Sequence, residues 1–199
     1  MKSPNFEDAM ERLHRLEGRD VDHPADPGGE TWMGITRRDY PEVWRQIENA
    51  DDDLERMAIA DGFYWREFWV RLQCEALTNH YVADWLFEAG VNMGRNTAVR
   101  LAQLVVNGFN HSIGRSPITV DGLIGPQTQG ALNALSRRYP LQLVAWLNVA
   151  QGMRYIRLSS PGAFDLRRLR ERPDRFRQFL VGWGRRLVTP SSLARRHGL

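Results

Sequence analysis

Residues 17–36 read Glu-Gly-Arg-Asp-Val-Asp-His-Pro-Ala-Asp-Pro-Gly-Gly-Glu-Thr-Trp-Met-Gly-Ile-Thr. Glu17 ends a segment of helical periodicity, Asp26 follows after eight intervening residues, and Thr31 follows after four more. Glycine and proline are frequent between these residues, which predicts a loop or a short β-hairpin. Helical periodicity dominates the rest of the chain, so we predict a mainly helical fold with one irregular segment near its start.

The first helix is predicted to begin at Pro4 after a Ser3 N-cap and to stop at Gly18. Its apolar residues recur at helical spacing. Asp51 is predicted to cap a later helix, a turn-rich stretch is expected at 108–116, and a short apolar segment at 118–120. The further helices are predicted over residues 37–47, 51–62, 72–89, 96–107, 129–138, 141–158 and 174–188.

Composition indicates an ordinary globular protein, with 199 residues, 42% hydrophobic and 26% charged. Cys74 is the single cysteine, so no intrachain disulfide can form. The sequence shows no apolar run of the ~20 residues that a membrane span needs, and no secretory signal at its start. Because the start of the sequence carries no secretory signal, we expect synthesis in a cytoplasm.

The five histidines lack metal-ligand spacing, so we expect neither a metal nor another cofactor.

Charge is unevenly distributed along the chain. Residues 1–136 hold 21 acidic side chains against 13 basic ones, whereas residues 137–199 hold 3 against 14. The net charges are −8 and +11, within a total of +3. Such a basic segment suits a polyanion, which could be nucleic acid, an anionic membrane face or an acidic cell envelope.

Glycoside hydrolysis requires a set of groups like those at residues 17–31. One protonated carboxylic acid must release the leaving oxygen, and a second group must stabilise the cation, attack it or activate water. At a helix C-terminus, the dipole favours the protonated form of Glu17. In the competing interpretation, Glu17 is a surface residue beside a C-capping glycine. Asp26 then only stabilises the turn formed by Asp-Pro-Gly-Gly.

Asp26–Thr36 resembles the Asp-Pro-Gly-Gly-x-Thr-x-x-Gly-Ile-Thr segment of the phage-type muramidases of glycoside hydrolase family 108. The Glu-Asp-Thr layout is also similar to that of phage lysozymes, although one residue shorter between Asp26 and Thr31. Further resemblances to the family, or to helical peptidoglycan-binding modules, lie at Tyr64-Trp65, 87–94, 121–128 and 179–186. Arg19, Asp20 and Glu88 depart from the family pattern, and the first two make the loop after Glu17 more charged.

This resemblance implies a lysozyme-like α+β catalytic lobe over residues 1–94, followed by a helical peptidoglycan-binding module over 95–199. It implies that Glu17 is the general acid, that Asp26 stabilises the oxocarbenium ion or acts as a base, and that Thr31 holds a water. For Tyr64, both sugar stacking and packing stay open, whereas packing is favoured for Trp65. The residues expected to bind substrate are Tyr64, Asn92, Asp121, Gly122, Gly125 and Thr128.

The function expected from the resemblance is cleavage of the bond between N-acetylmuramic acid and N-acetylglucosamine. We expect a monomeric phage endolysin held in the host cytoplasm until a holin opens the membrane. A chromosomal relative that loosens the wall is open on the same sequence. The basic end, including Arg167, Arg168, Arg170 and Arg172, is expected to contact an anionic envelope or lipopolysaccharide. The alternatives are a lytic transglycosylase, a non-catalytic wall-binding protein and, last, a nucleic-acid-binding protein, for which no motif is present.

Overall fold

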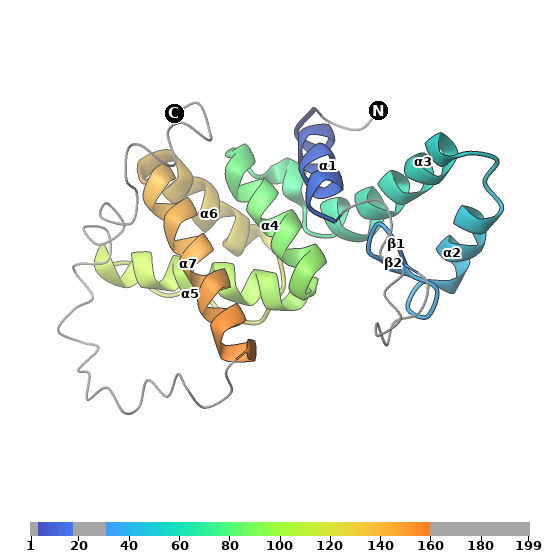
Figure 1. The fold of residues 1–199 in the computed structure, drawn as a ribbon. Helices are drawn as coiled ribbons and strands as arrows, with labels where there is room; N and C mark the ends of the chain where they lie inside the picture. Colours follow the sequence, from blue (N-terminus) through green and yellow to red (C-terminus); the bar gives the residue numbers. More distant parts are fainter. Residues whose placement is uncertain (1–3, 18–30, 160–199) are drawn as a thin grey trace. The chain divides into compact units, whose positions relative to one another are not determined.

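The structure is a computed structural model that describes the backbone of residues 4–17 and 31–159, and the side chains of residues 5–14 and 32–158. The chain divides into two compact units, one ending at Glu75 and the other beginning at Ala76. Figure 1 shows that the described part of each unit is mainly helical, as the sequence predicts.

The first unit begins with α1 (Pro4–Glu17), whose buried residues Phe6, Ala9, Met10 and Leu13 follow helical spacing. It continues through α2 (Pro41–Glu48), α3 (Asp53–Tyr64) and the π-helical segment η1 (Trp65–Val70). The short 3₁₀ segment η2 (Cys74–Ala76) follows at the unit boundary.

A β-hairpin forms the irregular part of the first unit, where strand β1 (Thr31–Trp32) pairs antiparallel with β2 (Ile35–Thr36). The two residues between the strands, Met33 and Gly34, have φ angles of 49° and 78°. Positive φ at both positions is what a type I′ hairpin turn requires, and glycine adopts it without steric cost. The hairpin predicted near the front of the chain is therefore confirmed.

Aromatic rings hold α1 against the helix formed by α3 and η1. The ring of Phe6 meets Trp65 and Trp69 edge to face, with centroids 5.0 and 5.4 Å apart. Phe6 is 1% exposed and Trp69 is 0% exposed, so these contacts belong to the core of the unit. At the other end of α1, Nε2 of His14 lies 3.0 Å from Oδ1 of Asp61 on α3. The earlier residue of α1, Phe6, thus meets the later residues of the α3–η1 helix, and the later residue, His14, meets an earlier one. Helix α1 therefore lies antiparallel to α3.

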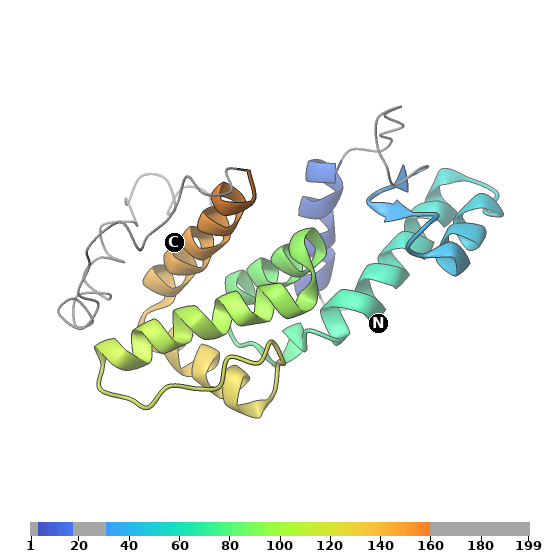
Figure 2. The same cartoon turned by 90° about the horizontal axis from the view of Figure 1, so that it is seen from below.

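The second unit consists, among the described residues, of four helices that pack on one another (Figures 1 and 2). They are α4 (His80–Met93), α5 (Arg95–Ser112), α6 (Pro126–Arg138) and α7 (Pro140–Ser159). Asn79 caps α4 by accepting from the backbone amides of Tyr81 and Val82. Gly94 alone separates α4 from α5, and its φ of 84° is a conformation that other residues rarely adopt.

Several predicted element bounds agree with the structure. The first helix begins at Pro4 and ends at Glu17, immediately before Gly18. The helix predicted over residues 141–158 is α7. The predicted N-cap Ser3 and the predicted helix 174–188 lie outside the described residues.

Other predictions were wrong at their ends. The residues after Thr36 do not start a helix until Pro41, because Ile35 and Thr36 pair with β1. Asp52, rather than Asp51, caps α3 by accepting from the Glu55 amide at 2.8 Å. The helix predicted over 72–89 is instead η2 followed by α4. Helix α5 extends to Ser112, so only residues 113–116 of the turn-rich stretch predicted over 108–116 are non-helical.

Candidate active site

The three predicted catalytic residues belong to the first unit. Glu17 is the last residue of α1, and Thr31 is the first residue of β1. Their side chains, and the whole of Asp26, lie outside the described residues. The structure thus places the backbone of Glu17 at a helix C-terminus and that of Thr31 in the hairpin, while their catalytic roles stay predictions.

Tyr64 holds the hairpin in place from helix α3. Its hydroxyl donates a hydrogen bond of 2.5 Å to the backbone carbonyl of Met33, at the tip of the hairpin turn. The side chain is 2% exposed and touches the rings of Phe63 and Phe68. A sugar-stacking ring needs an open face, so this burial favours the packing interpretation of Tyr64. Trp65 also packs, through its contact with Phe6.

His14 and Asp61 form a contact that no local sequence pattern indicates. His14 lies on α1 three residues before Glu17, and Asp61 lies on α3 three residues before Tyr64. Their side chains are 22% and 29% exposed. The contact joins residues 47 apart in sequence, and neither residue stands in a motif that would have pointed to it.

Asn92 lies in the last turn of α4 and is exposed. Its side-chain amide donates to the carbonyl of Glu88, one turn earlier, at 3.0 Å. Helix α4 ends at Met93, and α5 begins after Gly94. The side chain therefore lies beside the connection between two helices, and contact of Asn92 with substrate stays a prediction.

The stretch Asp121–Thr128 folds around one buried side chain, Gln103 of α5, which is 1% exposed. The amide nitrogen of Gln103 donates to Oδ1 of Asp121 at 2.8 Å, and to Oγ1 of Thr128 and the carbonyl of Leu123 at 3.1 Å each. The amide oxygen of Gln103 accepts from the backbone N–H of Gly122 at 2.9 Å. Oδ1 of Asp121, the N–H of Gly122, the carbonyl of Leu123 and the hydroxyl of Thr128 are thus bonded to α5, although the side chain of Asp121 is exposed.

Gly122 and Gly125 have different roles in this turn. Gly122 has a φ of 80°, and a Cβ there would lie 2.3 Å from the side-chain nitrogen of Asn96. Gly125 is the N-cap of α6, which begins at Pro126. Because proline starts the helix at this point, Thr128 lies within the first turn, where its hydroxyl meets Gln103.

Asp121 is held in its ionised form by this arrangement. The backbone N–H of Leu123 and the amide of Gln103 both donate to its carboxylate, and Arg100 adds a favourable charge. These contacts, the Leu123 N–H first, lower the pKa of Asp121 below its ordinary value of 3.8. Asp121 is thus an acceptor for the turn at neutral pH and not a candidate proton donor.

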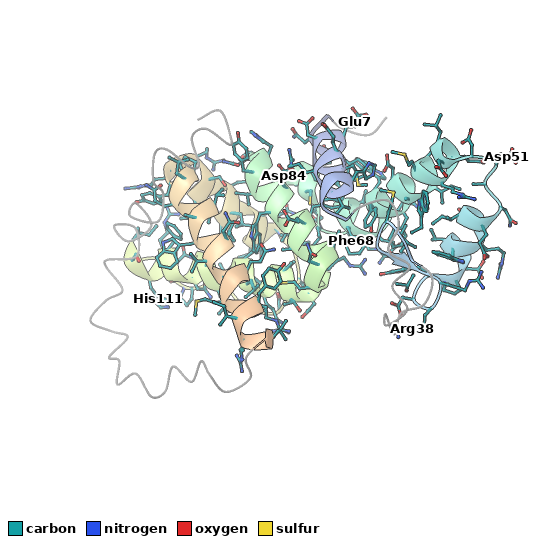
Figure 3. All side chains as sticks on the ribbon, viewed as in Figure 1. Glu7, Arg38, Asp51, Phe68, Asp84 and His111 are labelled. Atoms are coloured by element: carbon teal, nitrogen blue, oxygen red, sulfur yellow. The ribbon has the colours of Figure 1, made fainter. Side chains whose placement is uncertain are left out.

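No group of three or more His, Cys, Asp or Glu side chains that could hold a metal ion is found in the part of the chain that the structure describes. Within the same residues, none of the helices combines the length and apolar character that crossing a bilayer demands. Asp51 and Asp52 lie on the exposed connection between α2 and α3, where Figure 3 labels Asp51, and Asp53 begins α3.

Comparison with known proteins assigns both parts of the chain. Residues 10–94 match the family model "Glycosyl hydrolase 108". The chain carries a glycosyl hydrolase 108 domain. Residues 97–188 match the model "Predicted Peptidoglycan domain", so a peptidoglycan-binding domain follows it. The hydrolase domain makes the protein a glycoside hydrolase, and the two domains together indicate one that degrades peptidoglycan.

One solved structure resembles most of the chain. The chain is similar to the structure of SagA from Brucella abortus, with a TM-score of 0.55 and 26% sequence identity. The match covers 92% of this chain and 88% of the SagA chain. A search of the curated proteins finds no match.

The family match to the hydrolase domain extends beyond the first compact unit. It runs to residue 94, whereas the two units divide after Glu75. Helix α4 groups with the second unit because it packs on α5 and α7. The predicted domain boundary after residue 94 stays a prediction.

We predict opposite effects for alanine at two glycines of the second unit. Gly122→Ala should destabilise the turn by about 1–2 kcal/mol or more, because its φ is positive and Asn96 must move. Gly130→Ala, inside α6 with open space around the new Cβ, should stabilise by about 0.5–1 kcal/mol. Thermal unfolding of the three proteins measures both effects, and a shift of the same sign for both would contradict the turn geometry.

We predict a pH-dependent effect of Asp121→Asn on stability. Because the pKa of Asp121 is lowered by folding, its charge contributes stability that is fully present above about pH 4 and is lost as the pH falls through the folded value. The wild type should therefore melt at a higher temperature than the variant at neutral pH, and the difference should shrink below pH 4. A difference that is constant from pH 7 to pH 2 would contradict this role.

Proposed function

We propose that the protein is an N-acetylmuramidase that uses Glu17 as its general acid. The observation that supports this most is the glycosyl hydrolase 108 match over residues 10–94, which includes Glu17 at the C-terminus of α1 and Thr31 in the hairpin. The helix end supplies the negative dipole that favours a protonated carboxyl. A protonated carboxyl is what the leaving glycosidic oxygen requires.

The proposed reaction begins when Glu17 gives its proton to the glycosidic oxygen, so that the bond to the N-acetylmuramic acid ring breaks. Positive charge develops at the anomeric carbon, and Asp26 is proposed to stabilise it or to act as a base. Thr31 is proposed to hold the water that attacks this carbon. The products are two shorter glycan chains, one of which ends in a reducing N-acetylmuramic acid.

The second domain is proposed to bring the enzyme to its polymeric substrate. In the turn Asp121–Thr128, Oδ1 of Asp121 and the hydroxyl of Thr128 bond to Gln103, while the side chain of Asp121 is exposed. We therefore propose that Gly122, Gly125 and Thr128 contact the glycan through the shape and backbone of the turn, and that Asp121 contacts it through its exposed carboxylate. Asn92, exposed at the end of α4, is proposed as a further contact.

The cellular setting is also a proposal. An enzyme of this kind is proposed to act as a phage endolysin, kept in the host cytoplasm until a holin opens the membrane. Its substrate would then be the peptidoglycan of the periplasm. The resemblance of residues 26–36 to phage-type muramidases supports this setting.

Glu17→Gln should lower the turnover of purified peptidoglycan by about 10²–10⁴-fold, because it removes the proton donor and keeps the size of the side chain. Glu7→Gln is the matched control, since Glu7 is an exposed residue of the same helix (Figure 3). Clearing of outer-membrane-stripped cells gives the rate, and thermal unfolding shows whether the variants are folded. Equal activity of the Glu17→Gln variant and the wild type would contradict the proposal.

The products distinguish hydrolysis from the alternative chemistry. Mass spectrometry of the released muropeptides should show reducing N-acetylmuramic acid ends, which form when water attacks. Anhydro ends would instead identify a lytic transglycosylase, in which Glu17 acts without an activated water. No released fragment from the wild type would indicate a wall-binding protein.

Neutralising Arg167, Arg168, Arg170 and Arg172 with glutamine should weaken binding to anionic vesicles or lipopolysaccharide at low salt, because these side chains belong to the basic end. They lie outside the described residues. The matched control replaces Arg37, Arg38, Arg45 and Arg71 of the first unit, which lowers the net charge equally. Equal binding of both variants would contradict a contact made by the basic end.

A further inference from the structure

Helix α3 touches both segments that carry the proposed catalytic residues. Asp61 and Tyr64 are three residues apart on α3, so their side chains project from the same face of the helix. Asp61 meets His14, three residues before Glu17 on α1. Tyr64 donates to the carbonyl of Met33, two residues after Thr31 in the hairpin.

We propose that Asp61 and Tyr64 are positioning residues that together fix Glu17 and Thr31 relative to one another. This inference rests on the proposed function, because it concerns the geometry of the same two groups. Neither residue needs to touch the substrate. Each acts through a second residue, Asp61 through His14 and Tyr64 through the backbone of Met33.

The bond from Tyr64 restrains the hairpin at its least regular point. Met33 has a φ of 49° and is 6% exposed, and the hydrogen bond that its carbonyl accepts from Tyr64 is buried. A buried carbonyl without a donor costs about 1–3 kcal/mol. Removing the hydroxyl of Tyr64 leaves this carbonyl without its donor, so we expect the turn to shift until the carbonyl can bond to water. Thr31 belongs to the strand that leads into this turn and would shift with it.

The contact between His14 and Asp61 restrains α1 close to the end that carries Glu17. The start of α1 is held separately, because Phe6 lies between Trp65 and Trp69. Phe6 is eight residues before His14, so the aromatic contact leaves the last turn of α1 to be fixed nearer to Glu17. Asp61 supplies that restraint from the helix that also carries Tyr64.

Small displacements matter for such a pair of groups. A general acid and a water-holding hydroxyl must act on the same anomeric centre, and a misplacement of about 1 Å can cost 10²-fold in rate. A common frame for both segments limits relative movement, because any motion of α3 displaces the two groups together. Positioning of this kind affects turnover more than substrate affinity.

The first test uses Tyr64→Phe, which keeps the buried ring and removes only the hydroxyl. With soluble glycan strands as substrate, kcat should fall about tenfold, within the range that small misplacements cause, while KM changes less than twofold. Tyr139→Phe is the matched control, since Tyr139 follows α6 in the second unit and should leave kcat unchanged. A wild-type kcat for Tyr64→Phe would overturn the proposal.

A double-mutant cycle separates positioning from a general structural role. If Tyr64 acts through the hairpin that carries Thr31, Tyr64→Phe should cost little further kcat in a Thr31→Ala background. A loss that multiplies fully with that of Thr31→Ala would overturn the proposal for Tyr64. Thermal unfolding of each variant shows whether it is folded at the assay temperature.

Asp61 provides the second variant, because it is partly exposed and its replacement keeps the core intact. Asp61→Asn and His14→Gln should each lower kcat severalfold, and the double variant should be no worse than either one alone. Asp53→Asn, an exposed residue in the first turn of α3, is the control and should have no effect on kcat. Independent losses for His14 and Asp61, or none, would overturn the proposal for this pair.

The outcomes also distinguish this inference from the proposed function. If the wild type releases no glycan fragments, the proposed function fails before any variant is compared. If the wild type cleaves the strands and the variants of Asp61 and Tyr64 keep its kcat, the function stands and the positioning role fails.

Discussion

The hydrogen bond from Tyr64 to the carbonyl of Met33 is the constraint on which the first unit depends. It joins a helix to a hairpin whose turn has two consecutive residues with positive φ. The same helix continues into η1, where Trp65 and Trp69 receive Phe6 of α1. A polar contact and an aromatic contact on one continuous helix thus set the positions of the hairpin and of α1. The two segments that carry the proposed catalytic residues are the two that this helix holds.

In the second unit, the side chain of Gln103 holds a turn against a helix, as Tyr64 holds the hairpin in the first. Gln103 of α5 bonds to both ends of the Asp121–Thr128 turn, and each of its amide atoms has a partner there. The hydroxyl of Thr128 therefore faces inward, whereas Asp121 bonds to Gln103 through Oδ1 and stays exposed. Leu123, 66% exposed, lies two residues further along the same turn. A ligand of this turn would meet its backbone, an apolar side chain and the exposed carboxylate of Asp121.

Local chemistry explains which features could be predicted from the sequence. Pro4, Gly18 and the Met33-Gly34 pair act on the backbone at their own positions, so the ends of α1 and the hairpin follow from them. The helix predicted over residues 129–138 begins earlier in the structure, because Pro126 after Gly125 starts it. The partners of Tyr64 and His14 lie 31 and 47 residues away along the chain. No local sequence pattern encodes such contacts. The way α3 holds α1 and the hairpin therefore became visible only in the structure.

The division of charge gains a physical meaning from the two units. Residues 1–75 hold 18 acidic and 10 basic side chains, residues 76–136 hold 3 of each, and residues 137–199 hold 3 and 14. The acidic excess thus belongs to the first unit, and the basic excess begins within the second. An acidic catalytic unit alone would be repelled by an anionic wall polymer, although salt screens this repulsion beyond about 8 Å. A basic unit on the same chain offsets the repulsion, because binding by one part raises the effective concentration of substrate near the other. The basic second unit therefore offsets the electrostatic repulsion between the acidic first unit and an anionic wall polymer.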